Sequence, residues 1–292
     1  MTGPRKDLTR VALALGVYVV LYVAAQIVFF WVLGVTGELA GSTLTVLLGA
    51  LFANWLALRI YENLPLPAVG LGWSRASAEN LGMGLLGGIG SACVVIAVPL
   101  ALGAAHLAAS AERPEHGTLP FVILLLAVGA TGEELLFRGY GFQVLLARFG
   151  AFATILPVGV LFAFMHGANP NATWFGLANT AGFGFLFGYA FLRTRDLWLP
   201  IGIHFGWNLT LPLFGVNLSG LRMGITGHEV VWTAGNLWSG GAYGPEASVL
   251  TSGVLVVLFW YVWKAPLRRQ YSPLTDPPAE PVVCEPSPPL PS

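Results

Sequence analysis

Residues 11–35 read VALALGVYVVLYVAAQIVFFWVLGV, an apolar run that only Gln26 interrupts. A transmembrane helix needs about 20 consecutive apolar residues, so this run is long enough to cross a membrane. It is too long for the apolar part of a cleaved signal peptide and contains no clear cleavage site. We therefore predict that it is retained as a first membrane span.

The composition of the whole chain agrees with this first segment. Of the 292 residues, 55% are hydrophobic and only 10% are charged, against about 25% charged residues in a typical soluble domain. So few charges could not cover the surface of a water-soluble protein, whereas a protein surrounded by lipid does not need them. The formal net charge is zero, so no basic surface for nucleic acid is indicated. The partner that the composition predicts is the lipid bilayer.

Seven further apolar segments follow the first, and we predict an all-α, polytopic integral membrane protein with about eight transmembrane helices. The eight segments lie at about 10–35, 43–61, 80–109, 118–147, 151–167, 172–193, 197–215 and 247–264. The third segment is rich in glycine, with Gly84 and Gly88 among five in a short stretch. Small residues let neighbouring membrane helices approach closely, so we expect this segment to pack tightly.

The basic residues predict the orientation of the chain. With eight spans and the N-terminus inside, eleven Lys and Arg residues lie in cytoplasmic segments and two in outer segments. The inner residues are Arg5, Lys6, Arg10, Arg59, Arg75, Arg148, Arg193, Arg195, Lys264, Arg268 and Arg269, and the outer ones are Arg113 and Arg222. This excess matches the positive-inside rule. We predict a multi-pass protein of the cell membrane with both termini in the cytoplasm.

The chain divides into three parts on this interpretation. Residues 1–9 form a cytoplasmic N-terminal segment, and residues 10–270 form the transmembrane helical domain. Residues 271–292 form a tail that ends in PPAEPVVCEPSPPLPS. Proline-rich segments with few bulky apolar residues cannot bury enough surface to fold. We therefore expect the tail to be disordered in the cytoplasm.

Ionisable side chains within membrane spans are costly, so each is a candidate functional residue. Three groups stand out, and they are Glu133, Glu134 and Arg138 in TGEELLFRG, His166 in FAFMHG, and His204 and Asn208 in HFGWN. Glu134 and Arg138 are four residues apart, so they share a helix face and can form an ion pair. Glu133 is rotated by about 100° from Glu134 and is free to face another partner.

The positions of these residues along their helices let them meet. At about 1.5 Å per residue, Glu133 and His166 lie roughly 22 Å, and His204 roughly 12 Å, from the predicted cytoplasmic helix ends. We expect a cavity within the bilayer that opens towards the cytoplasm. There, Glu133 and His166 could deprotonate a water molecule, while His204 and Asn208 could donate hydrogen bonds to an oxyanion. Alternatively, Glu133, His166 and His204 could bind a divalent metal such as zinc.

The three motifs resemble those of the CAAX prenyl protease 2 family, also called the CPBP or Abi family of intramembrane proteases. Glu-Glu-x-x-x-Arg, Phe-x-x-x-His and His-x-x-x-Asn occur in that family's order between about 118 and 212. The resemblance implies an intramembrane endopeptidase, glutamate-dependent or metal-dependent, that cleaves a membrane-associated or lipid-linked peptide. It also implies that Glu133 and His166 activate the water, that His204 and Asn208 stabilise the oxyanion, and that Glu134 and Arg138 support them.

Two functions of other classes use the same residues. Buried Glu, His and Arg also form the proton relays of transporters, so a proton-coupled transporter is one alternative. A non-catalytic membrane partner or immunity protein that keeps the fold is the other.

Overall fold

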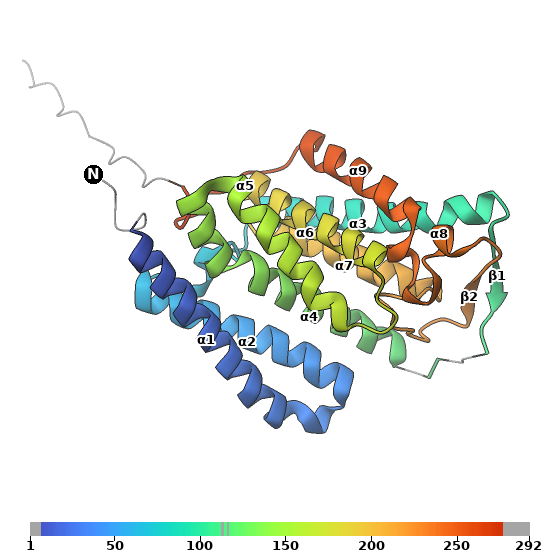
Figure 1. Cartoon of the computed structure of the whole chain (residues 1–292), viewed down its shortest axis with the longest axis horizontal. Helices are drawn as coiled ribbons and strands as arrows, with labels where there is room; N and C mark the ends of the chain where they lie inside the picture. Colours follow the sequence, from blue (N-terminus) through green and yellow to red (C-terminus); the bar gives the residue numbers. More distant parts are fainter. Residues whose placement is uncertain (1–6, 112–113, 116, 277–292) are drawn as a thin grey trace, which may run out of the picture.

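The computed structural model describes residues 7–111, 114–115 and 117–276, and it consists almost entirely of helices (Figure 1). The long helices are α1 (Leu8–Leu33), α2 (Glu38–Tyr61), α3 (Arg75–Ala101), α4 (Thr118–Arg138), α5 (Tyr140–Met165), α6 (Trp174–Thr194), α7 (Trp198–Leu213) and α9 (Val249–Lys264). The short elements are η2 (Gly34–Thr36), η3 (Leu66–Val69), η4 (His166–Ala168), α8 (Asn236–Ser239), η5 (Gly241–Tyr243) and η6 (Pro245–Ala247). Strands β1 (Ala105–Ala109) and β2 (His228–Trp232) pair antiparallel. The predicted all-α class is confirmed.

Five segments are long and apolar enough to cross a membrane, and they are Leu8–Thr36, Glu38–Tyr61, Arg75–Ala101, Thr118–Ala168 and Trp174–Thr194. The fourth of these contains α4 and α5, and α5 is itself broken by a kink at Gly150, where the backbone is not helical. Helices α7 and α9 have 16 residues each, fewer than the roughly 20 that a lipid-exposed span needs. Most of α7 is buried by its neighbours, so its ends need not reach both surfaces of the bilayer. The count of eight spans stays a prediction.

Three predicted boundaries are wrong. The third apolar segment ends as a helix at Ala101 and continues into strand β1. The fourth does not run to 147, because α4 ends at Arg138 and Gly139 breaks the chain direction with a non-helical backbone. Residues 271–276 are not a disordered tail, since Leu274 is buried and Asp276 pairs with Arg269. The rest of that predicted tail lies outside the described residues.

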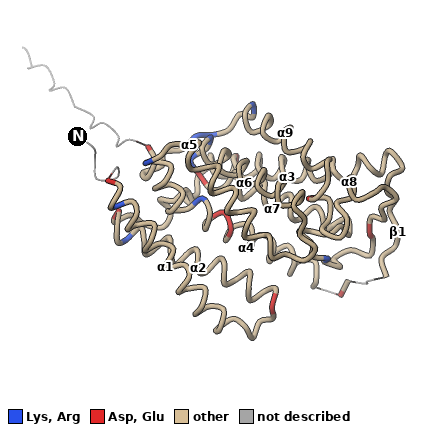
Figure 2. The backbone as a smooth tube through the Cα atoms, viewed as in Figure 1, with Lys and Arg blue, Asp and Glu red and all other residues tan. Residues whose placement is uncertain are grey.

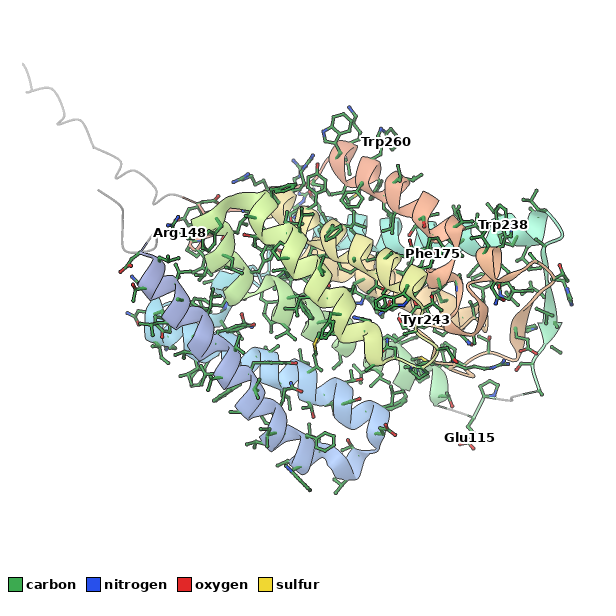
Figure 3. All side chains as sticks on the ribbon, viewed as in Figure 1. Glu115, Arg148, Phe175, Trp238, Tyr243 and Trp260 are labelled. Atoms are coloured by element: carbon green, nitrogen blue, oxygen red, sulfur yellow. The ribbon has the colours of Figure 1, made fainter. Side chains whose placement is uncertain are left out.

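The outer surface of the helices is apolar, as expected for contact with lipid. Charged residues are sparse, and the basic ones gather towards the end from which the N-terminus leaves the bundle (Figure 2). Large apolar side chains along the helices are exposed, including Leu124, Val256 and Trp260, each at least 60% exposed. Trp260 points away from the bundle in Figure 3. A water-soluble protein rarely exposes so much continuous apolar surface.

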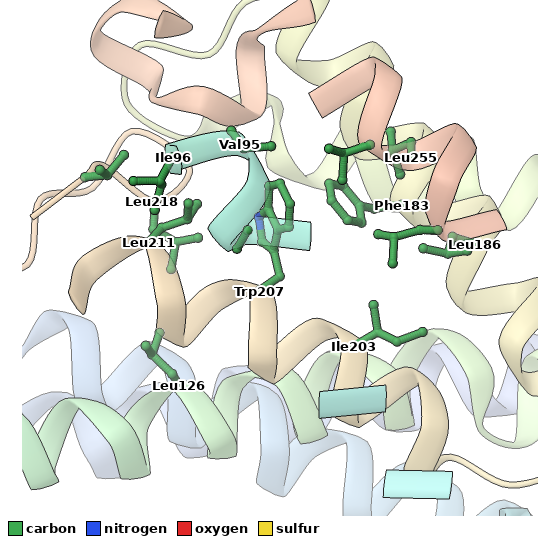
Figure 4. Packing of buried hydrophobic residues seen from close by; sticks show 14 of the residues in the cluster. Val95, Ile96, Leu126, Phe183, Leu186, Ile203, Trp207, Leu211, Leu218 and Leu255 are labelled. Atoms are coloured by element: carbon green, nitrogen blue, oxygen red, sulfur yellow. The ribbon is translucent and has the colours of Figure 1, made fainter. Parts of the chain in front are cut away.

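The interior consists of two apolar clusters that enclose the site. One joins α3, α4, α6, α7 and α9, and Trp207 lies at its centre among side chains such as Phe183 and Ile96 (Figure 4). The other joins α1 and α2 to the first half of α5 and the start of α7. Helix α7 therefore contributes to both clusters and lies at the centre of the bundle.

Glycine allows α3 to lie directly against α7, as the sequence predicted. A Cβ atom on Gly88 would lie 2.2 Å from the backbone oxygen of Ile203, and one on Gly84 would lie 2.4 Å from that of Leu199. Real Cβ atoms do not approach so closely, so only glycine fits at these two positions. The tight contact fixes α7, and with it the height of His204 and Asn208 within the bundle.

Candidate active site

Glu133 lies between two imidazole rings that come from different helices. Its Oε2 atom is 3.8 Å from Nε2 of His166 and 3.8 Å from Nε2 of His204. Among the described residues nothing donates a hydrogen bond to this oxygen, although the atom itself is buried. A buried carboxylate oxygen without a partner is rare in proteins and needs an explanation. The structure thus brings together three of the side chains that the sequence singled out.

Glu134 points the other way and forms the base of the site. Its Oε1 atom accepts from Nη1 of Arg138 at 3.3 Å and from Nδ1 of His204 at 2.9 Å. Both Glu134 and Arg138 are completely buried. The ion pair on one helix face follows from the spacing of four residues, as predicted. The contact with His204 was not predicted, because it depends on how α4 and α7 pack.

The hydrogen bonds fix how the two imidazoles present their rings. Nδ1 of His166 donates to the carbonyl oxygen of Phe162 at 2.8 Å, because a carbonyl oxygen can only accept. The Nε2 atom of His166 therefore carries the lone pair when the ring is neutral, and it faces Glu133. Nδ1 of His204 donates to the carboxylate of Glu134, which orients the ring and would stabilise its protonated form.

Aromatic rings surround the buried cation below these groups. The guanidinium carbon of Arg138 lies 4.9 Å from the ring centre of Phe162 and 5.2 Å from that of Phe187. Its Nη2 atom donates to the carbonyl oxygen of Gly184 at 2.8 Å. The ring of Phe187 also stacks on His204, with 4.9 Å between the ring centres. These contacts hold Arg138 in place and keep water from the base of the site.

A cavity of about 280 Å³ opens above Glu133. Its lining includes Glu133, His166, His204 and Asn208 together with side chains of α2, α4, α6 and the segment after α7. Asn208 lies one turn beyond His204 on α7 and also faces the cavity, as its spacing predicted. A cavity of this size is close to the lower limit of typical ligand pockets. It could hold a short stretch of an extended chain.

Glu246 and Ser219 also line the cavity, and sequence reasoning missed both. Glu246 is buried, and its Oε2 accepts a 2.8 Å hydrogen bond from the Ser219 hydroxyl. Its Oε1 accepts from the indole Nε1 of Trp207 at 3.3 Å. Burial raises the pKa of the Glu246 carboxyl above its usual value of 4.5, against the opposing effect of these bonds. No motif marks Glu246, because it lies in a loop far along the sequence.

The cavity opens on the side opposite to the one we expected. Its outer lining comes from the first turns of α2, the link after α5 and the loop after α7. The basic residues lie at the other ends of these helices, as Arg59 near the end of α2 and Arg193 near the end of α6 show. The expected opening at the basic end of the helices, which we predicted to be the cytoplasmic end, is therefore wrong. Distances along a helix place a residue relative to the helix end, but they do not show which end of the cavity neighbouring helices close.

The side chains around the cavity include donors of the kinds that bind metal ions. Glu133, His166 and His204 converge, but among the described residues no group of three or more His, Cys, Asp and Glu is placed so that it could hold one. His204 also directs its Nδ1 to Glu134, which leaves one ring nitrogen for the cavity.

Comparisons with known proteins agree with the motifs. Residues 115–210 match the family described as type II CAAX prenyl endopeptidase, Rce1-like. The chain is also 27% identical over 160 residues to the uncharacterized protein YyaK of Bacillus subtilis (strain 168). That alignment covers 53% of this chain and 52% of YyaK, so the chain spans about half the length of the curated relative it matches. The resemblance to the CAAX prenyl protease 2 family is thus confirmed over residues 115–210, which contain the whole cluster from Glu133 to Asn208.

Proposed function

We propose that the protein is an intramembrane endopeptidase in which Glu133 and His166 activate a water molecule. One observation carries this proposal. Oε2 of Glu133 has no partner among the described residues and lies 3.8 Å from Nε2 of His166. The 3.8 Å separation would allow one water molecule to lie at a normal hydrogen-bond distance of about 2.8 Å from both atoms. The carboxylate and the imidazole would then accept hydrogen bonds from the same water.

The reaction follows from these positions. Glu133 or His166 accepts a proton from the water, and the water oxygen forms a bond to the carbonyl carbon of the substrate peptide. The carbonyl electrons move to the oxygen, which becomes an oxyanion. When the carbon–nitrogen bond breaks, the proton passes to the departing amine, and the products are a carboxylate and an amine.

We assign the stabilisation of the oxyanion to His204 and Asn208. Both line the cavity on α7, and the carboxylate of Glu134 at Nδ1 supports a protonated His204 ring. A protonated ring would donate from Nε2 towards the cavity, as would the side-chain amide of Asn208. Donors that are held in place before the reaction stabilise a developing negative charge most effectively.

Purified protein in detergent should cleave members of a broad peptide library, with new termini detected by mass spectrometry. Glu133→Gln and His166→Ala should each lower the cleavage rate by about 10²–10⁴-fold, because each removes a proton acceptor. The matched control is Glu115→Gln, which changes an exposed carboxylate on the same side of the molecule. Cleavage by folded Glu133→Gln at the wild-type rate would refute the proposal.

The need for a metal is tested on the same preparation. Elemental analysis before and after dialysis against a chelator, with cleavage measured on both samples, separates the glutamate-dependent from the metal-dependent version. Unchanged cleavage by metal-free protein is expected from the steps above. Loss of cleavage that zinc restores would favour the metal-dependent version, with Glu133, His166 and His204 as the first residues to substitute.

A proton-coupled transporter is the weaker candidate. Alternating access requires that the central site connects in turn to both sides of the membrane. Below Glu133 the described chain is filled by Glu134, Arg138 and Leu135, all at 0% exposure. Uptake into liposomes that depends on a pH gradient and is lost in Glu133→Gln would nevertheless support this function over hydrolysis.

A further inference from the structure

The two ends of the helical bundle differ sharply in charge. Nine of the described Lys and Arg residues lie at one end (Figure 2), and they are Arg10, Arg59, Arg75, Arg148, Arg193, Arg195, Lys264, Arg268 and Arg269. Short contacts join them across helices, for example Arg75 and Arg268 through Glu79, and Arg195 and Arg269 through Asp276. We call this the basic end. At the other end of the bundle, Arg222 is the only described basic residue.

The cavity is closed towards the basic end. Directly behind Glu133 lie Glu134 and Arg138, which fill the space between α4, α6 and α7. Tyr140 follows at the start of α5 and is also completely buried, with its backbone N–H bonded to Asn54. None of the described residues that line the cavity belongs to the basic end.

The cavity is open at the end that lacks basic residues. Ser42 at the start of α2 and Leu221 in the loop after α7 are both exposed to solvent and both line the cavity. Large aromatic side chains surround this end, with Trp174 at 88% and Trp238 at 46% exposure. Exposed tryptophan is typical of the interface between lipid and water. The opening therefore lies close to a membrane surface.

Since basic residues favour the cytoplasmic side of a membrane, we propose that the active site is entered from the non-cytoplasmic side. That the cavity is an active site rests on the proposed function. The side from which it is entered follows from the charge distribution and the position of the cavity alone. The substrate is then a polypeptide segment that emerges from the outer leaflet or is anchored to it. A protein attached to the cytoplasmic leaflet would face the closed end and could not reach Glu133.

Single cysteines at the two ends test the orientation directly. The chain has two cysteines, Cys93 and Cys284, and both are first replaced by alanine. Ser42→Cys then reports the cavity opening, and Ala78→Cys, exposed in the first turns of α3, reports the basic end. A membrane-impermeant maleimide should label Ser42→Cys in right-side-out vesicles and Ala78→Cys in inside-out vesicles. Leu221→Cys serves as a second reporter of the opening.

The opposite pattern, or equal labelling of each cysteine in both kinds of vesicle, would overturn the inference. So would failure of both Ser42→Cys and Leu221→Cys to react from outside. Labelling does not require catalysis, so its outcome is independent of the peptide-cleavage assay. If the labelling gives the expected pattern but Glu133→Gln still cleaves, the proposed function is wrong, whereas the inferred side of entry remains supported. If both hold, a bulky maleimide on Ser42→Cys should also reduce cleavage.

Discussion

Arg138 is a fully buried cation whose charge is met by Glu134, a backbone carbonyl and aromatic rings. Arg138→Met should lower the free energy of unfolding by about 3–5 kcal/mol, because it leaves Glu134 as a buried, poorly compensated charge. Thermal unfolding in detergent measures the effect. Arg222→Met is the control, since the exposed pair of Arg222 with Glu229 should contribute only about 0–1 kcal/mol. Equal stability losses in the two variants would contradict this account.

Glu246 should make stability depend on pH. Burial raises the pKa of its carboxyl in the folded protein above 4.5, so the folded state holds the proton more tightly than the unfolded chain. The contribution of Glu246 is therefore complete below about pH 4.5 and is lost as pH rises through the raised pKa. The nearby His166 acts in the opposite direction.

Glu246→Gln removes this titration. The melting temperature of the wild type relative to that of Glu246→Gln should fall as pH rises above about 4.5. Both proteins are measured in the same detergent by differential scanning fluorimetry. A difference between the two melting temperatures that stays constant as pH rises would show that Glu246 does not titrate as its burial requires.

The residues of the site were largely predictable from the sequence. The hydrogen bonds that hold them in place were not. A spacing of four residues on a helix is enough to pair Glu134 with Arg138 and to place His204 and Asn208 on one face. The bond from His204 to Glu134 and the position of Glu246 depend on packing between distant segments. Sequence periodicity contains no information about such contacts.

At the scale of helices, the contact of α3 with α7 makes a sharp prediction. Gly88→Ala should destabilise the protein by about 1–3 kcal/mol, because the added carbon would overlap the backbone of Ile203. Gly90→Ala on the same helix is the matched control, since a Cβ there would meet nothing within 4 Å. Unfolding in detergent compares the two. Similar melting temperatures for both variants would mean that α3 and α7 can separate at little cost.

One predicted helix boundary was wrong because a side chain distant in sequence bonds to the backbone where the helix ends. Residues 118–147 are apolar enough for one continuous helix, yet the backbone breaks at Gly139. There the side-chain oxygen of Asn54 accepts a hydrogen bond from the backbone of Tyr140 at 2.6 Å. A Cβ on Gly139 would lie only 2.2 Å from that same oxygen. The partner is 86 positions away in sequence, so local composition gave no sign of the break.

At the scale of the whole molecule, the number of membrane crossings is open to measurement. Alkaline phosphatase folds only outside the cytoplasm, so its fusion after Thr36, Glu115 or Pro170 should be active. Fusion after Asn63 or Asp196 should be inactive. These outcomes follow if α1 to α6 each reach alternate sides of the membrane. An active fusion after Asp196 would mean that α6 does not return the chain to the basic end.

The β1–β2 ribbon limits how the protein can widen its cavity. Five residue pairs in register join the connection after α3 to the loop after α7, part of which lines the cavity. The pairing restrains the loop after α7, because moving this loop away from α3 would break the backbone hydrogen bonds between β1 and β2. The opposite rim, formed by the start of α2 and the link after α5, contains no strand among the described residues. A bulky substrate would therefore have to displace the start of α2 and the link after α5. We expect this movement to involve the α1–α2 hairpin.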